Sequence, residues 1–348
     1  MIDFSKQLLD VNSAVLDAFK KLNDIPGNLT LFIVDKNQKL VGTLTDGDIR
    51  RGFLTGLQLK DKVSSFMTKK FHFIRNADLT QSQIREIKNK GIRLLPVVND
   101  KNQIIRIVDF SKVKTILPLD VVFMAGGRGE RLRPLTDKVP KPMLKIGEKP
   151  ILEINLEHTS KFGIRNYFIC VKYLHEIIEE YFGSGEQKWG NLKYILEDEP
   201  LGTIGAITKI KEFKHDDILL MNADLFTDID IDIFYENFKR ENADMSIASI
   251  PYRVDVPYAV FDIEKDQIKG FKEKPTYTYY SNAGIYLFKK DIIKYIPDNK
   301  FFNATDLIEV LVNKKLKVTR FPILGYWIDI GKPEDFNKVQ EMMKFKLL

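Results

Sequence analysis

The feature that most constrains the fold is an apolar run followed at once by glycines, within residues 120–153. Val121–Ala125 is apolar and has the length of one buried strand. Gly126, Gly127 and Gly129 come next, where the backbone can turn tightly and approach a ligand closely. A strand that ends in a loop of exposed backbone amides predicts a site for phosphate groups at the end of that strand.

The loop that follows the glycines is rich in positive charge and in proline. Its cationic residues are Arg128, Arg131, Arg133, Lys138, Lys141, Lys145 and Lys149. Pro134, Pro140 and Pro142 keep the loop extended ahead of a helix that we expect to begin near Pro150. Because no helix follows the glycines directly, the pattern differs from the P-loop and from the Rossmann dinucleotide turn.

The segment GGRGERLRPLTDKVPKPMLKIGEKPILE resembles the signature of the sugar-1-phosphate nucleotidyltransferases. That signature is Gly-Gly-x-Gly-(Thr/Ser/Glu)-Arg-Leu, then Pro-Leu-Thr, then Pro-Lys-Pro-Met/Leu. The resemblance extends from Val121 to Phe336. It implies a Rossmann-like α/β domain with a mixed, mainly parallel sheet, and transfer of a nucleotidyl group from an NTP to a sugar 1-phosphate.

The segments after the loop alternate between helical and strand patterns, which predicts βαβ crossovers and a mostly parallel sheet. The expected helices and strands are Pro150–Phe162, Arg165–Val171, His175–Phe182, Leu192–Leu196 and Asp217–Met221, in the order helix, strand, helix, strand, strand. Four further segments suggest antiparallel strands: Ala243–Ile250, Tyr258–Ile263, Gln267–Lys272 and Ser281–Phe288. Thr203 is expected to cap the helix after Gly202.

Asp224 follows a fully apolar strand, at the carboxyl end where ligands bind in open α/β sheets. Beside a triphosphate site it is a candidate magnesium ligand, and the resemblance makes Asp329 the second carboxylate on the metal. It also implies that Arg131 and Lys141 neutralise the triphosphate. The nucleotide would contact Ala125, Gly126, Gly127, Gly129, Glu199 and Gly202. The sugar phosphate would contact Glu273, Lys274, Asn282 and Gly284.

The implied reaction needs neither a general base nor a covalent nucleophile, because the attacking phosphate oxygen is already ionised. Catalysis is then positioning plus charge stabilisation. The residues before this enzyme resemble a CBS domain pair, as described below. An enzyme of this family with a CBS pair in front of it resembles the guanylyltransferases of legionaminic acid pathways, which use GTP and glucosamine 1-phosphate. Mannose or heptose guanylyltransferases, and uridylyl-, cytidylyl- or thymidylyltransferases, are alternatives. A regulatory protein that senses sugar nucleotides is the alternative outside enzymes.

The N-terminal residues contain an internal repeat. Strands are predicted at Leu29–Asp35, Leu40–Leu44, Ile92–Asn99 and Ile104–Val108, with helices near Ser13–Leu22 and Thr80–Lys90. Two β-α-β-β-α units in tandem resemble a CBS domain pair. We therefore expect a CBS pair in residues 1–117 and the nucleotidyltransferase in 118–348, with the boundary near Pro118.

The first repeat ends in a motif, GTLTDGDI, that resembles the closing motif of CBS domains. The resemblance implies that Thr45 faces a phosphate and Asp48 the ribose of an adenine nucleotide. The second repeat has Asp109 and Lys112 at these positions, which argues against a second nucleotide site. Thr followed by Asp is also an ordinary helix start. Nucleotide sensing and a purely structural role in dimerisation or packing both remain open.

Composition excludes several classes of partner. The net charge is +6, but the 54 basic and 48 acidic residues are interspersed, which favours a small phosphate-rich ligand over nucleic acid. The single Cys170 lies in an apolar run and is predicted to be a buried thiol in a reducing compartment. The sequence shows neither a signal peptide nor a membrane span, so a cytoplasmic protein is expected. We also expect the protein to form a homo-oligomer. The four histidines lack metal-ligand spacing.

Overall fold

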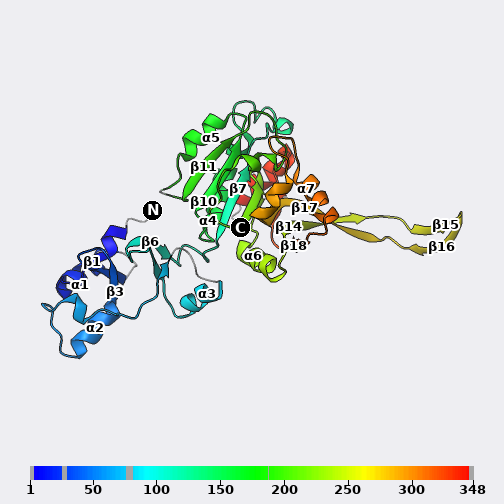
Figure 1. The fold of residues 1–348 in the computed structure, drawn as a ribbon. Coiled ribbons are helices and arrows are strands. Elements are labelled where there is room, and N and C mark those ends of the chain that lie inside the picture. The colour runs from blue at the N-terminus through cyan, green and yellow to red at the C-terminus, as the bar shows by residue number, and fades with distance from the viewer. Residues whose placement is uncertain (1–3, 26–29, 76–80, 187, 345–348) are drawn as a thin grey trace. The chain divides into compact units, whose positions relative to one another are not determined.

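The computed structural model describes residues 4–25, 30–75, 81–186 and 188–344 (Figure 1). These residues form two compact units. The smaller unit extends to Leu117 and includes the short segments Lys161–Gly163 and Glu186–Lys188, and the larger unit begins at Pro118. No strand of one unit pairs with a strand of the other among the described residues.

The first repeat of the smaller unit has the element order that the sequence predicts. It consists of β1 (Leu8–Asp10), α1 (Val15–Asn23), β2 (Thr30–Val34), β3 (Leu40–Thr45) and α2 (Asp46–Leu54). The sheet order is β1-β2-β3, with β1 parallel and β3 antiparallel to β2. Leu31 and Ile33 of β2 pack in the core of this repeat, whereas Phe32 packs with Leu94 and Val98 of the second repeat. The continuous apolar run of β2 is therefore explained by burial on both faces.

The second repeat differs at its end. It contains β4 (Ile74–Arg75), α3 (Gln81–Asn89), β5 (Leu94–Val98) and β6 (Ile104–Asp109), with the sheet order β4-β5-β6. Residues 110–112 form a turn instead of the expected closing helix. Asp109 accepts hydrogen bonds from the backbone N–H and hydroxyl of Ser111, at 2.9 and 2.6 Å. Lys112 cannot supply the acceptor that a capping box needs at its third helical position.

Thr45 and Asp48, the predicted nucleotide contacts, form the capping box of α2. The Asp48 N–H donates to Thr45 Oγ1 at 3.2 Å, and the Thr45 N–H donates to Asp48 Oδ2 at 2.8 Å. Arg51 and Thr68 donate to Asp48 Oδ1 at 2.6 and 3.1 Å. Both oxygens of the carboxylate therefore have partners within the chain. This arrangement favours the structural interpretation of the motif, and binding of an adenine nucleotide remains a prediction.

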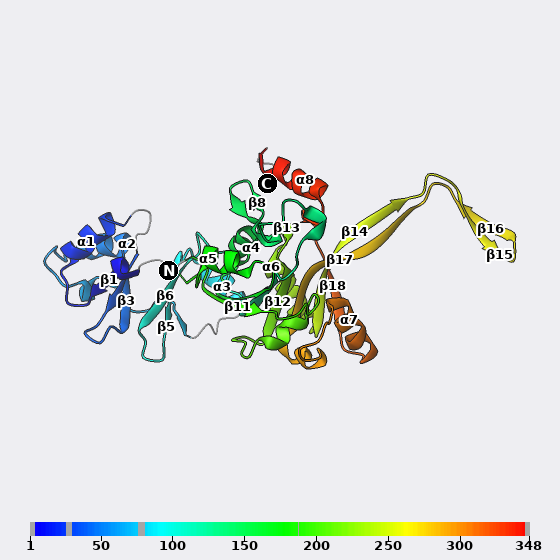
Figure 2. The ribbon, with the colours of Figure 1, turned by 90° about the horizontal axis from the view of Figure 1, so that it is seen from above.

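A seven-stranded sheet forms the centre of the larger unit (Figure 2). Its strands are β11 (Asn191–Leu196), β10 (Asn166–Val171), β7 (Leu119–Met124), β12 (Asp217–Asn222), β17 (Thr276–Lys289), β14 (Met245–Asp255) and β18 (Val318–Pro322), in that spatial order. The first four strands are parallel, and β17 is antiparallel to both of its neighbours. The mixed, mainly parallel sheet expected from the sequence is confirmed.

Five helices and two small ladders accompany this sheet. The helices are α4 (Ile151–Ser160), α5 (His175–Phe182), α6 (Ile231–Arg240), α7 (Ala304–Asn313) and α8 (Pro333–Lys344). The ladders pair β8 (Lys145–Ile146) with β9 (Lys149–Pro150), and β13 (Leu225–Thr227) with β19 (Trp327–Asp329).

Cys170 is fully buried in β10, and burial raises the pKa of its thiol, as expected for a structural cysteine. Within the described residues, no helix is both long and apolar enough to cross a membrane.

The order of strands places the glycine loop at a crevice. From β7 the chain continues to β10 and β11 on one side, and then returns to β12 on the other side of β7. Such a reversal of strand order leaves a crevice at the carboxyl ends of the two diverging strands. Gly126 follows β7, and Asp224 follows β12, so both begin at this edge.

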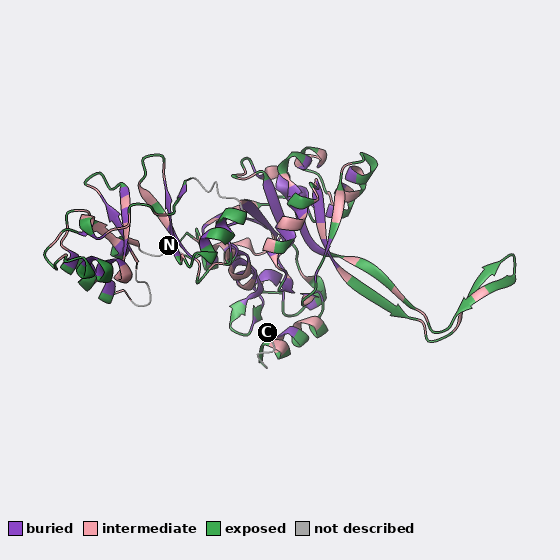
Figure 3. Cartoon of the chain, turned by 90° about the horizontal axis from the view of Figure 1, so that it is seen from below, coloured by how far each residue is buried: buried purple, intermediate pink, exposed green. Residues whose placement is uncertain are grey.

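The larger unit also carries a long arm (Figures 1 and 2). Strands β14 and β17 stay paired beyond the sheet as far as Asp255 and Thr276. The arm continues into the hairpin β15 (Val260–Glu264) and β16 (Gln267–Lys272). Figure 3 shows the arm mostly as exposed surface, in contrast to the buried strands of the sheet. The predicted antiparallel strands are confirmed, but two of them lie outside the body of the unit.

Asp120 is fully buried near the start of β7, at the end of the strand opposite to the glycine loop. Its carboxylate accepts hydrogen bonds from His215 Nδ1 at 2.7 Å, from Asn166 Nδ2 at 2.8 Å, and from the backbone N–H of Lys214 at 2.6 Å. Burial alone would raise the pKa of Asp120, but these hydrogen bonds hold it below its ordinary value. The ionised carboxylate therefore joins three segments of the chain.

We predict that Asp120→Asn lowers the free energy of unfolding at pH 7 by about 3 kcal/mol, because it breaks a buried charged network. A lowered pKa stabilises the fold above the ordinary aspartate pKa, and this contribution is lost as the pH falls through the folded value. The difference between wild type and variant should therefore shrink on acidification in urea titrations. Asp216→Asn, at an exposed aspartate paired with Lys290, is the control and should resemble wild type.

Candidate active site

A cleft of about 730 Å³ lies at the carboxyl ends of β7, β11 and β12. Its lining comes from the glycine loop, the loop after β11, and the end of β12. The lining residues are Met124, Ala125, Gly126, Gly127, Arg128, Glu130, Lys141, Pro142, Lys172, Glu197, Asp198, Glu199, Pro200, Leu201, Gly202, Thr203, Asn222, Asp224 and Phe301. The cleft therefore contains most of the residues predicted to contact a nucleotide.

Two of the glycines are required by their surroundings. A Cβ atom on Gly126 would lie 2.6 Å from Glu197 Oε1, so any larger residue would displace that carboxylate. Gly129 has a φ of 65°, and a Cβ there would lie 3.0 Å from Thr136 and 3.1 Å from Lys141. Thr136 also donates to the Gly129 carbonyl at 2.9 Å. The loop is thus folded closely onto the residues that line the cleft and its base.

Lys141 lies between the two predicted metal carboxylates. Its Nζ forms an ion pair with Asp224, and lies 3.6 Å from Oδ1 of Asp329. The carboxylates are brought together by the β13–β19 ladder, in which Leu225 pairs with Asp329. The Ile330 N–H also donates to the Asp224 carbonyl at 3.2 Å. Residues that are far apart in the sequence therefore form one charged cluster at the cleft.

Two carboxylate oxygens of this cluster have no hydrogen-bond donor. Burial, and then the nearby Asp224, raise the pKa of the Asp329 carboxyl, whereas Lys141 and Arg131 act in the opposite direction. Oδ1 of Asp224 and Oδ1 of Asp329 are both buried and accept no hydrogen bond in the structure. Two buried carboxylate oxygens without donors fit a bound cation, because such atoms are costly to leave unsatisfied.

Arg131 lies beside this cluster but not in the lining of the cleft. It is in a short 3-10 turn, Glu130–Leu132, and its Nη2 lies 3.5 Å from the place that a Cβ of Gly331 would occupy. Its charge also acts on Asp329. The structure therefore brings Arg131, Lys141, Asp224 and Asp329 together, as the sequence suggested. Across the described residues, no group of three or more His, Cys, Asp or Glu side chains is arranged so that it could hold a metal ion.

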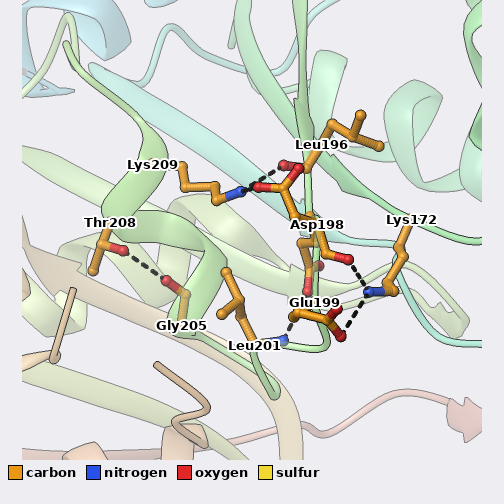
Figure 4. A network of polar contacts seen from close by, with 9 residues as sticks. Lys172, Leu196, Asp198, Glu199, Leu201, Gly205, Thr208 and Lys209 are labelled. Atoms are coloured by element: carbon orange, nitrogen blue, oxygen red, sulfur yellow. Dashed lines mark hydrogen bonds and ion pairs between the residues drawn. The ribbon is translucent and has the colours of Figure 1, made fainter. Parts of the chain in front are cut away.

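The loop after β11 also lines the cleft, and Figure 4 shows the polar contacts that hold this loop. Lys209 donates to Asp198 Oδ2 at 2.6 Å, and Lys172 lies 3.8 Å from Glu199 Oε2. Lys172 also donates to the Asp198 carbonyl at 2.6 Å. The loop is thus attached to β10 and to the following turn by two lysines. Glu199, a predicted nucleotide contact, lines the cleft but is highly exposed.

Sequence reasoning missed two residues of this loop region, Glu197 and Lys172. Glu197 is only 6% exposed, and burial raises the pKa of its carboxyl. Its Oε2 accepts the Leu201 N–H at 3.1 Å, whereas Oε1 lies beside Gly126 in the cleft. An acidic residue that ends a strand in the same way as Asp224 was the available signal. Lys172 had no comparable signal, because its position depends on how β10 pairs with β11.

Gly202 and Thr203 show how the loop is fixed to α7. Gly202 has a φ of 78°, and a Cβ there would lie 2.5 Å from the Phe302 carbonyl oxygen. Thr203 does not cap the following helical turn, which has Ile204 as its N-cap and makes no side-chain capping bond. Instead, Thr203 Oγ1 accepts the Ala304 N–H at 2.9 Å at the start of α7. The expectation that Thr203 caps its own helix was wrong.

The predicted sugar contacts fall into two separated groups. Asn282 accepts the Gly284 N–H at 2.9 Å, and a Cβ on Gly284 would lie 2.6 Å from Asn222 Nδ2, so this pair adjoins the cleft. Glu273 and Lys274 instead lie on the arm, in the link between β16 and β17. They are exposed and do not line the cleft of their own chain. The structure therefore does not bring all of the predicted sugar contacts together.

We predict that Lys141→Met lowers the free energy of unfolding at pH 7 by about 2 kcal/mol. This loss is smaller than that for a fully buried ion pair, because Asp329 still reaches solvent. Without the ammonium group, the pKa of Asp329 should rise further. A raised carboxyl pKa means that the folded state binds the proton more tightly, so acidification should recover stability. Denaturant titrations at several pH values test this, with the exposed Lys145→Met as control. An equal loss at every pH would contradict it.

Comparisons with known proteins agree with this geometry. The nucleotidyl transferase family matches residues 120–344, and the CBS domain family matches residues 8–54, within the first repeat. A heptose 1-phosphate guanylyltransferase of Campylobacter jejuni is 33% identical over 220 residues, which are 63% of this chain and 97% of that protein. A mannose-1-phosphate guanylyltransferase of Mycobacterium tuberculosis is 30% identical over 226 residues, covering 63% of this chain and 62% of that protein.

Solved structures show the same likeness. HddC from Yersinia pseudotuberculosis matches with 30% sequence identity and a TM-score of 0.51, covering 64% of this chain and 99% of that one. A second structure of HddC, complexed with GMP-PN, matches at 29% identity with the same TM-score and coverage. The family match, the fold and the charged cluster agree. The chain therefore belongs to the nucleotidyl transferase family of sugar-1-phosphate nucleotidyltransferases and carries a CBS domain in its N-terminal part.

Proposed function

We propose that this protein transfers a guanylyl group from GTP to a sugar 1-phosphate, giving a GDP-sugar and pyrophosphate. The observation that carries the proposal is the cluster of Lys141, Asp224 and Asp329 beside the glycine loop. A sensor of sugar nucleotides would need the loop and the lysine, but not two carboxylates whose buried Oδ1 atoms accept no hydrogen bond. An enzyme is therefore favoured over a regulatory protein.

In this reaction a phosphate oxygen of the sugar 1-phosphate attacks the α-phosphorus of GTP. A new phosphorus–oxygen bond forms on one side while the bond to pyrophosphate breaks on the other. No proton is transferred, because the attacking oxygen is already ionised at neutral pH. The chain's contribution is to align the two substrates and to balance negative charge. Backbone amides of the glycine loop and the cations Arg131 and Lys141 are the groups proposed for this purpose, because the loop and Lys141 line the cleft and the charge of Arg131 acts on Asp329 beside it.

Asp224 and Asp329 are proposed to hold Mg²⁺. Their unpaired, buried oxygens are hard ligands of the kind that Mg²⁺ prefers. When bound, the ion supplies positive charge to phosphate oxygens. Lys141 contacts both carboxylates in the structure, so it partly balances their charge and holds them close together.

Glu197 supports guanine as the base. The base-pairing edge of guanine carries two adjacent donors, N1–H and the N2 amino group, which a carboxylate can accept together. Glu197 is a buried carboxylate in the lining of the cleft, where it accepts the Leu201 N–H and adjoins Gly126. Uracil and thymine present one donor between two acceptors, which suits an amide better than a carboxylate. The guanylyltransferase relatives agree with this choice.

The choice of sugar depends on the domain composition of the chain and on its relatives. The fusion with a CBS domain favours glucosamine 1-phosphate by resemblance, whereas the relatives named above act on heptose or mannose 1-phosphates. We propose glucosamine 1-phosphate as the first substrate to test. A matrix of GTP, UTP, CTP and dTTP against glucosamine, mannose, heptose and glucose 1-phosphates, assayed by pyrophosphate release, decides both choices. GTP should give the highest kcat/KM. The proposal fails if no combination releases pyrophosphate.

We predict that Glu197→Gln lowers kcat/KM for GTP by about ten-fold or more, the loss expected for one bidentate base contact. The glutamine side chain would have an acceptor and a donor where the glutamate has two acceptors, so it could no longer accept both N–H groups of guanine. The ratio of kcat/KM for GTP to kcat/KM for UTP should therefore fall. Because burial raises the pKa of Glu197, wild-type KM for GTP should also rise as the pH is lowered, and the variant should lack this trend. Glu212→Gln, exposed and outside the cleft, is the control. Unchanged preference would contradict the assignment.

A further inference from the structure

The tip of the arm has one apolar and one polar face. In the β15–β16 hairpin, Phe261 pairs with Phe271 and Ile263 pairs with Ile268. Phe261 and Ile263 are two residues apart on β15 and share a face. Each lies directly opposite its partner, and a β-bulge inserts one extra residue in β16 between Phe271 and Ile268, so the four side chains lie on one face. They are between 53% and 66% exposed. Such alternation is typical of a sheet with one buried face, yet the described residues leave this face open to solvent.

The stem of the arm repeats the pattern. Tyr252 pairs with Tyr279, and Val254 lies two residues from Tyr252 on the same face. These three side chains are also exposed, and the stem is green on both strands in Figure 3. Together, stem and tip present on the order of 700 Å² of apolar side chain, close to what one partner contributes to a stable protein interface.

The arm also carries residues that belong to the proposed reaction. Lys274 is a cation and Glu273 an acceptor, suited to a sugar phosphate and to sugar hydroxyls. The stem remains paired between these residues and the cleft, and the Val256 N–H donates to the Pro275 carbonyl at 3.1 Å. Lys274 is eight residues from Asn282, so it lies about 25 Å along the ribbon from the cleft. The arm cannot place Lys274 in its own cleft while it stays extended.

We propose that the arm is exchanged between two copies of this chain, so that Glu273 and Lys274 of one copy complete the sugar-phosphate end of the cleft of the other. The inference rests on the proposed function, because it assigns these residues to the sugar phosphate. Exchange of an identical element between two protomers is a low-cost route to a dimer. It covers the apolar faces of both arms and supplies both clefts at once.

A second copy is the occupant that the structure favours over an unrelated partner. The arm carries two groups suited to a sugar phosphate, and only another copy of this chain has an identical cleft that needs them. The apolar area is also sufficient for a dimer without any contribution from the body of the molecule. A two-stranded ribbon is marginally stable alone in water, so the arm gains stability from being covered.

The oligomeric state gives a test that does not depend on activity. Phe261→Ser combined with Phe271→Ser removes apolar area without touching the core, because both side chains are exposed. Sedimentation should show a dimer for wild type, and a shift toward monomer of at least ten-fold in Kd for the double variant. Lys269→Ala, on the same hairpin, is the matched control and should remain dimeric. A wild-type monomer at micromolar concentration would overturn the proposal.

Complementation tests whether the residues act between copies. Lys274→Ala disables the arm, and Asp224→Ala disables the cleft, so each variant alone should be nearly inactive. If arms are exchanged, a mixed dimer has one complete cleft, made of the Lys274→Ala body and the Asp224→Ala arm. Co-refolding the two variants at equal amounts should then restore about a quarter of wild-type activity, since half of the dimers are mixed and each has one working cleft.

The outcomes separate this inference from the proposed function. If wild type releases pyrophosphate but the mixture recovers no activity although mixed dimers form, arm exchange is wrong and the function stands. Full activity of Lys274→Ala alone would remove the arm from the reaction and likewise overturn the inference. An inactive wild type that is nevertheless dimeric through its arm would instead count against the proposed function.

Discussion

The ion pairs of Lys141 with Asp224 and Asp329 are the contacts on which the site depends. Asp224 immediately precedes β13, Asp329 ends its partner strand β19, and Lys141 comes from the loop after the glycines. Removing the ammonium group would leave two like charges close together in a partly buried place, which is unfavourable. The same residues therefore maintain the local fold and provide the charges that a polyphosphate requires.

The nucleotide end and the sugar end of the site are built differently. At the proposed nucleotide end, Glu197 adjoins Gly126 and accepts the Leu201 N–H, so the contacts are already formed within the sheet's own loops. The sugar end is divided between the Asn282 region and the arm. A preformed nucleotide site costs little to order on binding, whereas a divided site adds the requirement that two elements meet.

Much of this could be predicted from the sequence, because local patterns carried it. Helix α5 has the predicted bounds, and Lys141 and Asp224 were found from the loop and the end of a strand. Failures occurred where an outcome depended on distant contacts. Thr203 bonds to α7 instead of capping its own turn, and the helix after Asp109 is missing because Lys112 cannot complete a cap. The sequence predicts the strands of the arm but not its extension from the sheet, because that extension depends on contacts of its exposed faces and not on local patterns.

The pairing of Leu225 with Asp329 has a consequence for synthesis of the protein. The glycine loop, Lys141 and Asp224 all emerge from the ribosome well before the strand that carries Asp329. Until then, the growing chain has a phosphate-binding loop with only one of the two carboxylates. An unfinished chain therefore lacks Asp329 and the ion pair that Lys141 makes with it, so the charged cluster is complete only when β19 pairs with β13.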